Sequence, residues 1–356
     1  MKNLNFPVHQ TRVDTIKESF NLTDAESRQK YFQAKAGPEI EKLKKFLEKN
    51  TFVAYLIGKK NSGKGTYTRL FMEAVGDDHV GHVSIGDIVR DIHKGLSDPA
   101  KKTELVKFLE KNYRGFHTVA ETIDIIEGRS QESLISSDLI LALVKYEISK
   151  RPKKAIFIDG FPRDFDQISH SLYLKELIGY REDPDFLVFI DVPESVIDER
   201  IKYRVVCPKC HTPRNLKLLA TKEVGYNEQK KEFYLICDDT NCTGDKMVAK
   251  EGDKQGIEPI RKRLEVDDQI FAKLLGIKGL PQIKLRNAVP VAKKDLVDDY
   301  EITPEFVYTN DADSKKVVTS TKPWVVKDDD GEDTYSLLPA AVAVSLIKQT
   351  AKVLGL

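Results

Sequence analysis

The sequence predicts an α/β fold in which helices cover both faces of a parallel sheet. Three apolar runs of strand length, TFVAYLIG, AIFIDGFPR and DFLVFIDVP, alternate along the chain with segments of helical periodicity. Continuous apolar runs indicate strands that are buried on both sides, as the strands of parallel sheets are. Ligands of such sheets bind beyond the carboxyl ends of the strands, so a site is expected where these runs end.

The first 150 residues are expected to be mainly helical around the first strand. Residues 1–50 look like a helical N-terminal extension, in which Thr23 and Glu26 have the spacing of a capping box and Gly37-Pro38 breaks the helix. TFVAYLIG follows as a buried strand, KNSGKGTYTRLFMEAV as a helix that begins in a glycine-rich turn, and HVSIGD as a short strand and turn. Residues 88–150 are mostly helical again.

The second half of the chain interrupts this core twice. SVIDERIKYR and residues 257–275 are expected to be helices, and between them lies a polar, turn-rich insert. Residues 280–335 alternate in places, as in EFVYTN and KKVVTST, which predicts short antiparallel strands. LPAAVAVSLIKQTAKVL closes the chain as an amphipathic helix. The predicted organisation is a core of residues 51–204 with 256–356, an arm at 84–145, the insert at 205–255, and a further β-containing insertion at 276–335.

The composition gives little reason to expect a nucleic-acid or membrane protein. Lys and Arg number 57 against 56 Asp and Glu, so the net charge is +1 and no overall field favours polyanions. The N-terminus lacks the apolar core of a signal peptide, and no run is long enough to cross a bilayer. A cytoplasmic monomer that binds no nucleic acid is the expectation.

A glycine-rich phosphate loop follows the first strand. Residues 58–66 read GKKNSGKGT, which fits G-x-x-x-x-G-K-[ST] if one residue is allowed between Lys64 and Thr66. Glycines let backbone N–H groups face a phosphate, and the helix N-terminus adds its dipole. The pattern predicts a P-loop NTPase fold of three layers, in which Lys64 reaches the β- and γ-phosphates of ATP and Thr66 helps to hold Mg²⁺. The predicted ATP-binding residues of the loop are Gly58, Asn61, Ser62, Gly63, Lys64, Gly65 and Thr66.

Further motifs follow in a fixed order. They are SIGDIVR at 84–90, DLILALV at 138–144, IDGFPRDFDQ at 158–167, an arginine pair at Arg200 and Arg204, and RKRL at 261–264. Together with Gly-Lys-Gly-Thr in the phosphate loop, they resemble the adenylate kinase family over residues 52–270. The resemblance implies a nucleoside monophosphate kinase, with ATP as donor and AMP as the favoured acceptor.

The resemblance also implies roles for individual side chains. Arg90 and Arg163 hold the monophosphate, and Gln167 reads the adenine edge of AMP. Arg204 and Arg263 clamp the transferring phosphoryl group, and Arg200 lies against the ATP base. Phosphoryl transfer needs several converging cations, and arginine forks onto phosphate oxygens without deprotonating. Asp159 follows a buried strand and is a candidate to hold Mg²⁺ through water. The remaining candidates for the monophosphate site are Ile85, Leu134, Ile135 and Gly160.

The chain departs from the family pattern in the arm and in the insert. Ile85 stands where the family commonly has Thr, and the arm between Arg90 and Leu134 is longer than usual. Both differences favour a UMP, CMP or GMP kinase as an alternative, whereas Gln167 favours AMP. The insert has Lys250-Glu251-Gly252-Asp253 where the family has an R-x-D-D stretch, so Lys250 is the candidate substitute for a lid arginine.

All four cysteines lie in the insert. Cys207 and Cys210 form one close pair, and Cys237 and Cys242 form another. Two such pairs on two turns can supply four thiolates to a tetrahedral Zn²⁺, and clustered cysteines in a chain without a secretion signal favour a metal over disulfides. Four thiolates leave no open position, so the zinc is expected to be structural and to organise a lid.

Two alternative functions from other classes of protein remain. A zinc-ribbon protein that binds nucleic acid around a degenerate NTPase core is one, supported by the basic stretch HTPRNLK and opposed by the acidic stretches EVGYNEQ and CDDTNC. A regulatory pseudokinase is the other, and the intact Lys64, Asp159 and Arg163 argue against it.

Overall fold

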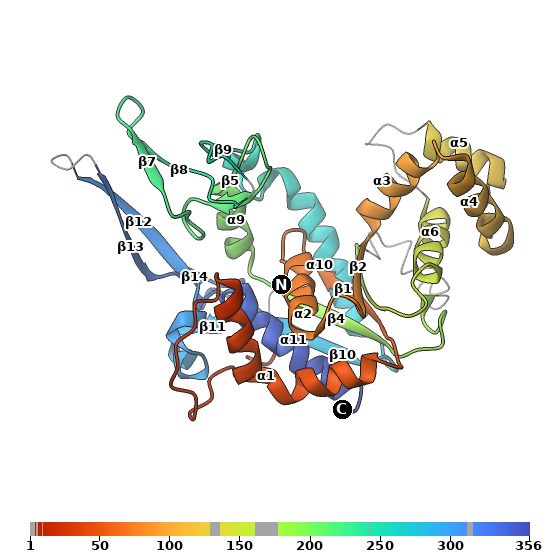
Figure 1. The fold of residues 1–356 in the computed structure, drawn as a ribbon, viewed down its shortest axis with the longest axis horizontal. Coiled ribbons are helices and arrows are strands. Elements are labelled where there is room, and N and C mark those ends of the chain that lie inside the picture. Colours follow the sequence, from red (N-terminus) through yellow and green to blue (C-terminus); the bar gives the residue numbers. More distant parts are fainter. Residues whose placement is uncertain are drawn as a thin grey trace.

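A five-stranded parallel sheet forms the centre of the protein (Figure 1). The computed structural model describes residues 4, 6–8, 10–128, 136–160, 177–240, 242–311 and 316–356. The strand order is β10-β4-β1-β3-β2, and every neighbouring pair is parallel. The strands are β1 (Val53–Gly58), β2 (Val80–Ser84), β3 (Ala155–Asp159), β4 (Asp185–Asp191) and β10 (Gln282–Arg286).

Helices cover both faces of this sheet, and the apolar runs of the strands divide between the two faces. Ala54 and Leu56 of β1 join one buried cluster, whereas Val53, Tyr55 and Ile57 join the other. The first face packs against α1 (Ala25–Leu47), α2 (Lys64–Val75) and α11 (Pro339–Val353). The second packs against α6 (Ser137–Ser149) and α10 (Arg261–Leu275). The predicted three-layer α/β fold is confirmed.

The N-terminal helix differs from the prediction. It begins at Ala25, with Asp24 and not Thr23 as the capping residue, because the Asp24 side chain accepts a hydrogen bond from the backbone N–H of Ser27. The break predicted at Gly37-Pro38 is present as a kink, one residue earlier, at which two helical stretches meet. The chain bends at Ala36, whose φ is −146°, and the helix then resumes since buried residues on both sides of the bend hold it against α2 and α11.

The arm extends from one end of the core. Its helices are α3 (Ile85–Gly95), α4 (Pro99–Asn112) and α5 (Val119–Glu127), and they pack on each other and on α6. Figure 1 shows this group standing away from the sheet, on the right of the view. The mainly helical character predicted for residues 88–150 is confirmed for the described residues.

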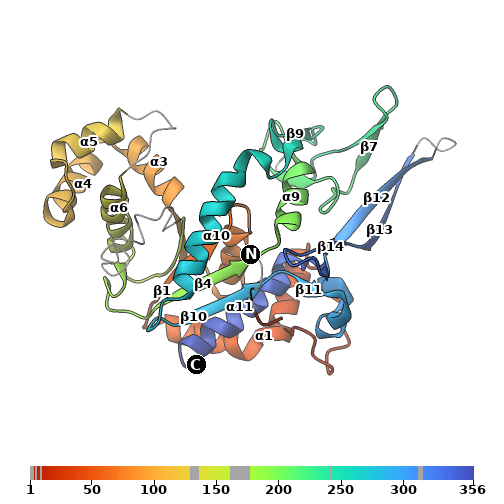
Figure 2. The same ribbon diagram turned by 180° about the vertical axis from the view of Figure 1, so that it is seen from behind.

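The cysteine-containing insert stands on the other side of the core, and Figure 2 shows the same separation from behind. It is entered from α9 (Glu194–Lys202) and left through two short 3₁₀ helices, η1 (Asp253–Gln255) and η2 (Glu258–Ile260), that lead into α10. Small antiparallel sheets make up its body. Their strands are β5 (Arg204–Val206), β6 (Pro213–Asn215), β7 (Val224–Asn227), β8 (Glu232–Leu235) and β9 (Val248–Ala249).

The segment after α10 begins as part of the core. The first strand of the predicted insertion at 276–335 is β10, which pairs in parallel with β4 and is the fifth strand of the central sheet. The antiparallel strands predicted there follow it: β11 (Val289–Pro290), β14 (Val325–Lys327) and β15 (Asp333–Tyr335) form one sheet, and β12 (Pro304–Asp311) and β13 (Lys316–Pro323) form a hairpin. Two 3₁₀ helices, η3 (Val291–Leu296) and η4 (Asp299–Glu301), lie between β11 and β12.

The β12–β13 hairpin lies against the base of the insert (Figure 1). The backbone N–H of Phe306 donates to the carbonyl of Lys217 at 2.8 Å, and the Tyr308 hydroxyl donates to the carbonyl of Leu216. The rings of Phe233 and Tyr308 have centroids 5.5 Å apart. The hairpin and the insert, which are far apart in the sequence, therefore pack against each other.

The last helix is more buried than an amphipathic helix would be. Residues 340–347 of α11 are all buried, because the helix packs against α1 and α2 as well as against β10. Among the described residues, no helix combines the length and the apolar character needed to cross a membrane.

Candidate active site

The phosphate loop connects β1 to α2 in the conformation that its sequence predicts. Asn61 has φ of 65° and Gly63, which caps α2, has φ of 95°, so both lie in the left-handed region that Asn and Gly tolerate best. A side chain at Gly58 would place its Cβ only 2.8 Å from the carbonyl oxygen of Ile190. Close packing against β4 therefore requires glycine at this position.

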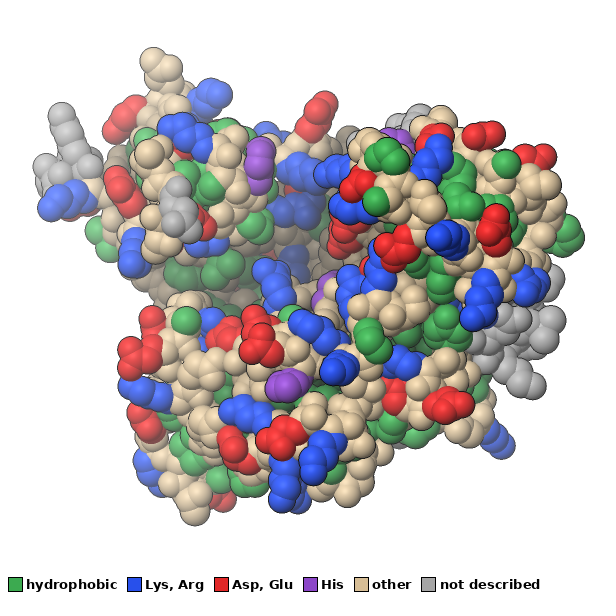
Figure 3. Space-filling model, turned by 45° about the vertical axis from the view of Figure 1, so that its right-hand side comes forward, with side chains coloured by type: hydrophobic (Ala, Val, Ile, Leu, Met, Phe, Trp, Pro, Cys, Tyr) green, Lys and Arg blue, Asp and Glu red, His purple; other side chains and the backbone are tan. Residues whose placement is uncertain are grey.

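The loop borders a cavity of about 400 Å³ at the carboxyl ends of the central strands. Register explains the position: Asp159 at the end of β3 pairs with Leu56 of β1 on one side and with Ser84 of β2 on the other. The predicted residues that line the cavity are Gly58, Asn61, Lys64, Asp159, Gly160 and Arg263. Figure 3 shows the molecular surface hollowed between lobes, with Lys and Arg side chains along the hollow.

Lys64 lies inside the loop. Its ammonium group donates to the carbonyls of Gly58 and Lys59, each at 2.9 Å, and lies 3.7 Å from a carboxylate oxygen of Asp159. The lysine and the aspartate are thus held a short distance apart at one end of the cavity. A cation and an acid in this arrangement can bind a phosphate and a hydrated metal ion, respectively.

Arg263 enters the same cavity from α10. Its guanidinium lies 2.9 Å from Asp267, one turn later on the helix, and Asp267 also accepts a hydrogen bond from the backbone N–H of Lys60 at 2.9 Å. Asp267 therefore joins the arginine to the phosphate loop. Neither Lys60 nor Asp267 was expected from the sequence, although the four-residue spacing from Arg263 is a signal that could have indicated Asp267.

Lys59 points away from the cavity into a group of acids. Its ammonium lies 3.1 Å from Glu194, 3.2 Å from Asp329 and 3.4 Å from Asp268, and the residue is 4% exposed. Burial alone would lower the pKa of Lys59, but the three carboxylates, Asp329 foremost, raise it well above its usual value. Burial raises the pKa of Asp268, and the charge of Lys59 opposes that rise. The lysine is therefore firmly charged and is held on the outer side of the loop.

His82 of β2 lies beside the loop on another side. A Cβ at Gly65 would be 3.7 Å from its ring, and its Nε2 is buried without a hydrogen-bond partner among the described residues. Burial lowers the pKa of His82, although Asp159 and Asp87 act in the opposite direction. The imidazole is consequently neutral at neutral pH and adds no charge next to Lys64.

The arm and the lid carry their predicted residues outside this cavity. Arg90 on α3 is largely exposed and pairs with Asp87, and Ile85 is 2% exposed within the apolar cluster under the arm. Arg200 lies on α9, and Thr66 lies in the first turn of α2. None of these four residues lines the cavity: Ile85 and Arg90 belong to the arm, which stands to one side of the core, whereas Thr66 is only two residues from Lys64 at the start of α2.

Arg204 has a partner within the lid. Its guanidinium makes two hydrogen bonds, at 2.6 and 2.8 Å, to the carboxylate of Asp253. Asp253 belongs to the stretch that replaces the family's R-x-D-D pattern, whereas Lys250, the expected substitute for a lid arginine, is exposed. Four of the predicted site residues, Leu134, Ile135, Arg163 and Gln167, lie outside the described residues.

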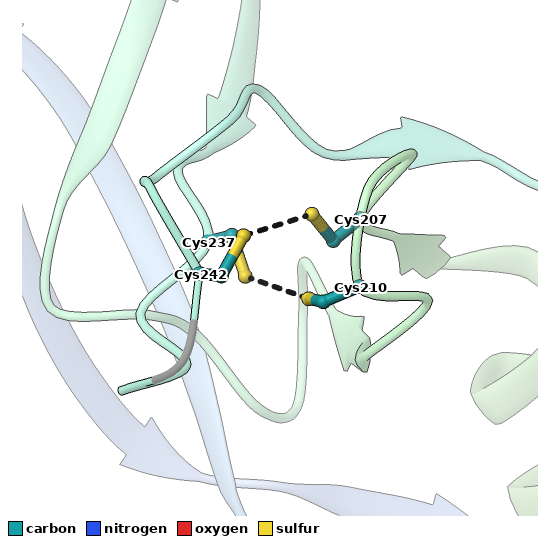
Figure 4. A group of neighbouring side chains, drawn as sticks. All are labelled: Cys207, Cys210, Cys237 and Cys242. Atoms are coloured by element: carbon teal, nitrogen blue, oxygen red, sulfur yellow. Dashed lines mark hydrogen bonds between the residues drawn. The ribbon is translucent and has the colours of Figure 1, made fainter.

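The four cysteines meet in the lid (Figure 4). All four sulfur atoms lie within 4.8 Å of one another, and the nearest contacts join Cys207 to Cys242 at 3.6 Å and Cys210 to Cys237 at 3.5 Å. Sulfurs at the corners of a tetrahedron around Zn²⁺ would be about 3.8 Å apart, given zinc–sulfur bonds of roughly 2.3 Å. The predicted clustering of the two cysteine pairs is confirmed, and its dimensions fit a tetrahedral metal.

Similarity to known proteins indicates the family to which the chain belongs. No protein-family model matches it. The chain is 31% identical to the adenylate kinase of Thermotoga maritima over 218 residues, which cover 60% of this chain and 80% of that protein. It is 27% identical to the adenylate kinase of Treponema denticola over 267 residues, 75% of this chain and 95% of that protein. It is also 29% identical to the mitochondrial GTP:AMP phosphotransferase of Drosophila melanogaster over 224 residues, 63% and 82% of the two chains. With the phosphate loop, Asp159 and Arg263 assembled around one cavity, these similarities show that the chain belongs to the adenylate kinase family.

Proposed function

We propose that this protein is an ATP:AMP phosphotransferase, which moves the γ-phosphoryl group of ATP to AMP reversibly and yields two ADP. The observation that carries the proposal is the convergence of Lys64, Asp159 and Arg263 on one cavity at the strand ends. The names of its relatives, adenylate kinase and GTP:AMP phosphotransferase, support the same chemistry.

The groups around the cavity suit the positioning and neutralisation that phosphoryl transfer requires. Backbone N–H groups of the loop and the N-terminus of α2 would hold the β-phosphate, and Lys64 would reach the β- and γ-phosphates. Arg263 would neutralise the transferring group after exchanging Asp267 for phosphate oxygens. Arg204 would join it from the lid in the same way, after leaving Asp253.

The side chains of Thr66 and Asp159 would hold Mg²⁺, Asp159 through water. The fit rests on the donor set: hydroxyl and carboxylate oxygens are hard ligands that suit Mg²⁺, and Asp159 stands at the strand end next to Lys64. The ion would neutralise charge on the phosphate oxygens. The protein's part is to orient the phosphates along the loop and to exclude water when the lid closes.

AMP remains the favoured acceptor, with Arg90, Arg163 and Gln167 proposed for its binding and Ile85, Leu134, Ile135 and Gly160 as neighbours. Arg200 is proposed to lie against the ATP base. A UMP, CMP or GMP kinase is the alternative, because the arm is longer than the family's and has Ile85 where the family commonly has Thr. The cytoplasmic location and the monomeric state are also predictions.

We further propose that Zn²⁺ binds Cys207, Cys210, Cys237 and Cys242 and organises the lid. Their sulfur positions fit a closed tetrahedral site, which points to a structural metal. The rest of the insert offers few buried apolar groups: its cluster contains the two buried cysteines, Leu235 and Met247. A lid with so small a core gains most of its stability from the metal.

A coupled spectrophotometric assay tests the enzyme proposal. Purified protein is assayed with ATP or GTP as donor and AMP, UMP, CMP or GMP as acceptor, in Mg²⁺ and in EDTA. We expect turnover with ATP and AMP that EDTA abolishes. Failure of all four acceptors under conditions in which ATP binds would contradict the proposal, whereas faster turnover of UMP, CMP or GMP would correct only the acceptor.

A further inference from the structure

We propose that Asp329, which the insertion after β10 contributes, is a positioning residue of the phosphate loop and sets its affinity for the polyphosphate of ATP. The inference rests on the proposed function. Asp329 lies in the turn between β14 and β15, in a segment beyond residues 52–270, which carry the motifs that resemble the family.

The first step of the argument is that Asp329 holds two elements at once. One oxygen lies 3.2 Å from the ammonium of Lys59, in the phosphate loop, and the other accepts the backbone N–H of Glu194 at 2.8 Å. Glu194 is the first residue of α9, the helix that leads into the lid. The carboxylate therefore ties the loop to the start of that helix.

The second step is that the position of Lys59 determines the shape of the loop. The carbonyl of Lys59 accepts the Lys64 ammonium at 2.9 Å and the backbone N–H of Ser62 at 3.1 Å. Its side chain is anchored on the outer side, among carboxylates, and does not line the cavity. The backbone and the ammonium group of Lys59 are therefore both held in place. The carbonyl of Lys59 consequently keeps one position, where it accepts the hydrogen bonds of Lys64 and of the Ser62 backbone.

The third step is that the anchor is electrostatic and mostly removed from water. Lys59 is 4% exposed and the side chain of Asp329 is 16% exposed, so their attraction is weakly screened. The turn that carries Asp329 is itself fixed: the Ser195 hydroxyl donates to the carbonyl of Lys327, and Arg286 pairs with Asp328 at 2.7 Å. A rigid turn can hold the lysine in one place.

Substitutions on the two sides of the ion pair test the proposal in the full-length protein. Asp329→Asn keeps an oxygen for the Glu194 N–H but loses the charge, and Lys59→Met removes this ion pair together with those to Glu194 and Asp268. For each we expect the Kd of a non-hydrolysable ATP analogue, measured by calorimetry, and the KM for ATP to rise about tenfold, while the KM for AMP changes less than about twofold. The double variant should bind no more weakly than Lys59→Met, because loss of the lysine already removes the contact with Asp329.

Glu332→Gln, an exposed acid of the same turn, is the matched control and should bind the analogue as the unaltered protein does. Thermal melting verifies that each variant is folded, and either single variant that folds decides the matter. An unchanged Kd in a folded Asp329→Asn or Lys59→Met variant would overturn the inference. So would additive losses in the double variant. Because the readout is ATP binding, the inference is tested even if no acceptor is phosphorylated, an outcome that would defeat the proposed function alone.

Discussion

The carboxylate of Asp267 lies 2.9 Å from the guanidinium of Arg263, one turn earlier on α10. The same carboxylate accepts the N–H of Lys60, so the arginine proposed to act on the transferring group is held against the phosphate loop. The pair places a cation beside the cavity before any phosphate arrives. It also keeps the arginine in one orientation, which lowers the entropy that is lost when phosphate oxygens replace the carboxylate.

Arg263→Lys should lower kcat by about 10²–10³, because a lysine is a point charge that cannot fork onto two phosphate oxygens. The Tm should change little, since the side chain is 39% exposed. Arg261→Lys, two residues earlier and outside the cavity, is the control and should retain full activity. Normal turnover in Arg263→Lys would remove Arg263 from the mechanism.

Lys64→Met should reduce kcat by about 10³ or more while the protein stays folded. The charge that loses its partner is Asp159, whose side chain is 22% exposed at the cavity, so no fully buried charge is left unpaired. Steady-state kinetics and circular dichroism provide the two measurements. Lys230→Met, in the turn of the lid, is the control. Turnover within tenfold of the unaltered protein would show that Lys64 does not contact the transferring group.

Cys237→Ser should lower the zinc content from about one ion per chain and reduce the Tm of the lid, because structural zinc returns on the order of 10–16 kcal/mol in small domains. Elemental analysis and melting with and without a strong chelator measure the effect. His211→Asn, next to Cys210 and with φ of 60°, should keep the metal. The zinc site would be excluded if protein purified without chelators contained no metal and Cys237→Ser left its melting temperature unchanged.

Asp185→Asn should alter the pH dependence of stability. Burial raises the pKa of Asp185 to about 6, although the N–H of Gly179 acts in the opposite direction. Below pH of about 4 the carboxyl is protonated in both states and contributes nothing. Between about 4 and 6 only the unfolded chain releases the proton, so stability falls as pH rises, and above 6 the loss is constant.

The loss from Asp185 is on the order of 1–2 kcal/mol after allowance for solvent screening. Urea unfolding of the variant at pH 4 and pH 7 should show a smaller fall than in the unaltered protein. Asp78→Asn, at an exposed site, should leave the pH dependence as it is. Identical pH profiles for Asp185→Asn and the unaltered protein would contradict the predicted shift.

Lys35→Met should destabilise the protein by about 3–5 kcal/mol, the usual effect of leaving one charge of a buried pair without its partner. The Lys35 ammonium lies 2.6 Å from Asp298 and 4.0 Å from Glu301, and Glu301 is fully buried. Chemical denaturation measures the loss. Lys30→Met, which breaks an exposed pair one turn earlier on α1, should change stability by less than about 0.5 kcal/mol.

Local sequence patterns predicted the central sheet and the side of the cavity that the phosphate loop forms. Apolar runs of strand length identified β1, β3 and β4, because strands covered on both faces carry apolar side chains in both directions. Glycines and Lys64 identified the phosphate loop, since its backbone geometry depends on a few adjacent residues. The left-handed conformation at Asn61 follows from the same local chemistry.

Contacts between distant segments were not predictable from the sequence. Nothing near Asp329 marks it as a partner of Lys59, because 270 positions separate the two. Asp253 was noticed only as a departure from a pattern, yet it holds Arg204. Gly37-Pro38 indicated the kink in α1 correctly, since the rule for proline is local, whereas the contacts that hold both parts of the helix against α2 and α11 join distant segments.

The buried charges that join Lys35 to Asp298 and Glu301 have a consequence for how such a chain could have arisen. Lys35 belongs to the N-terminal extension, and the two acids belong to the insertion after β10; Thr11 and Tyr31 of the extension also donate to Glu301. An ancestor that acquired only one of these segments would have carried a charge directed at a partner that did not yet exist. We therefore expect the two segments to be inherited together among related kinases. A relative with one alone should carry neutral residues in place of Lys35 or of the two acids.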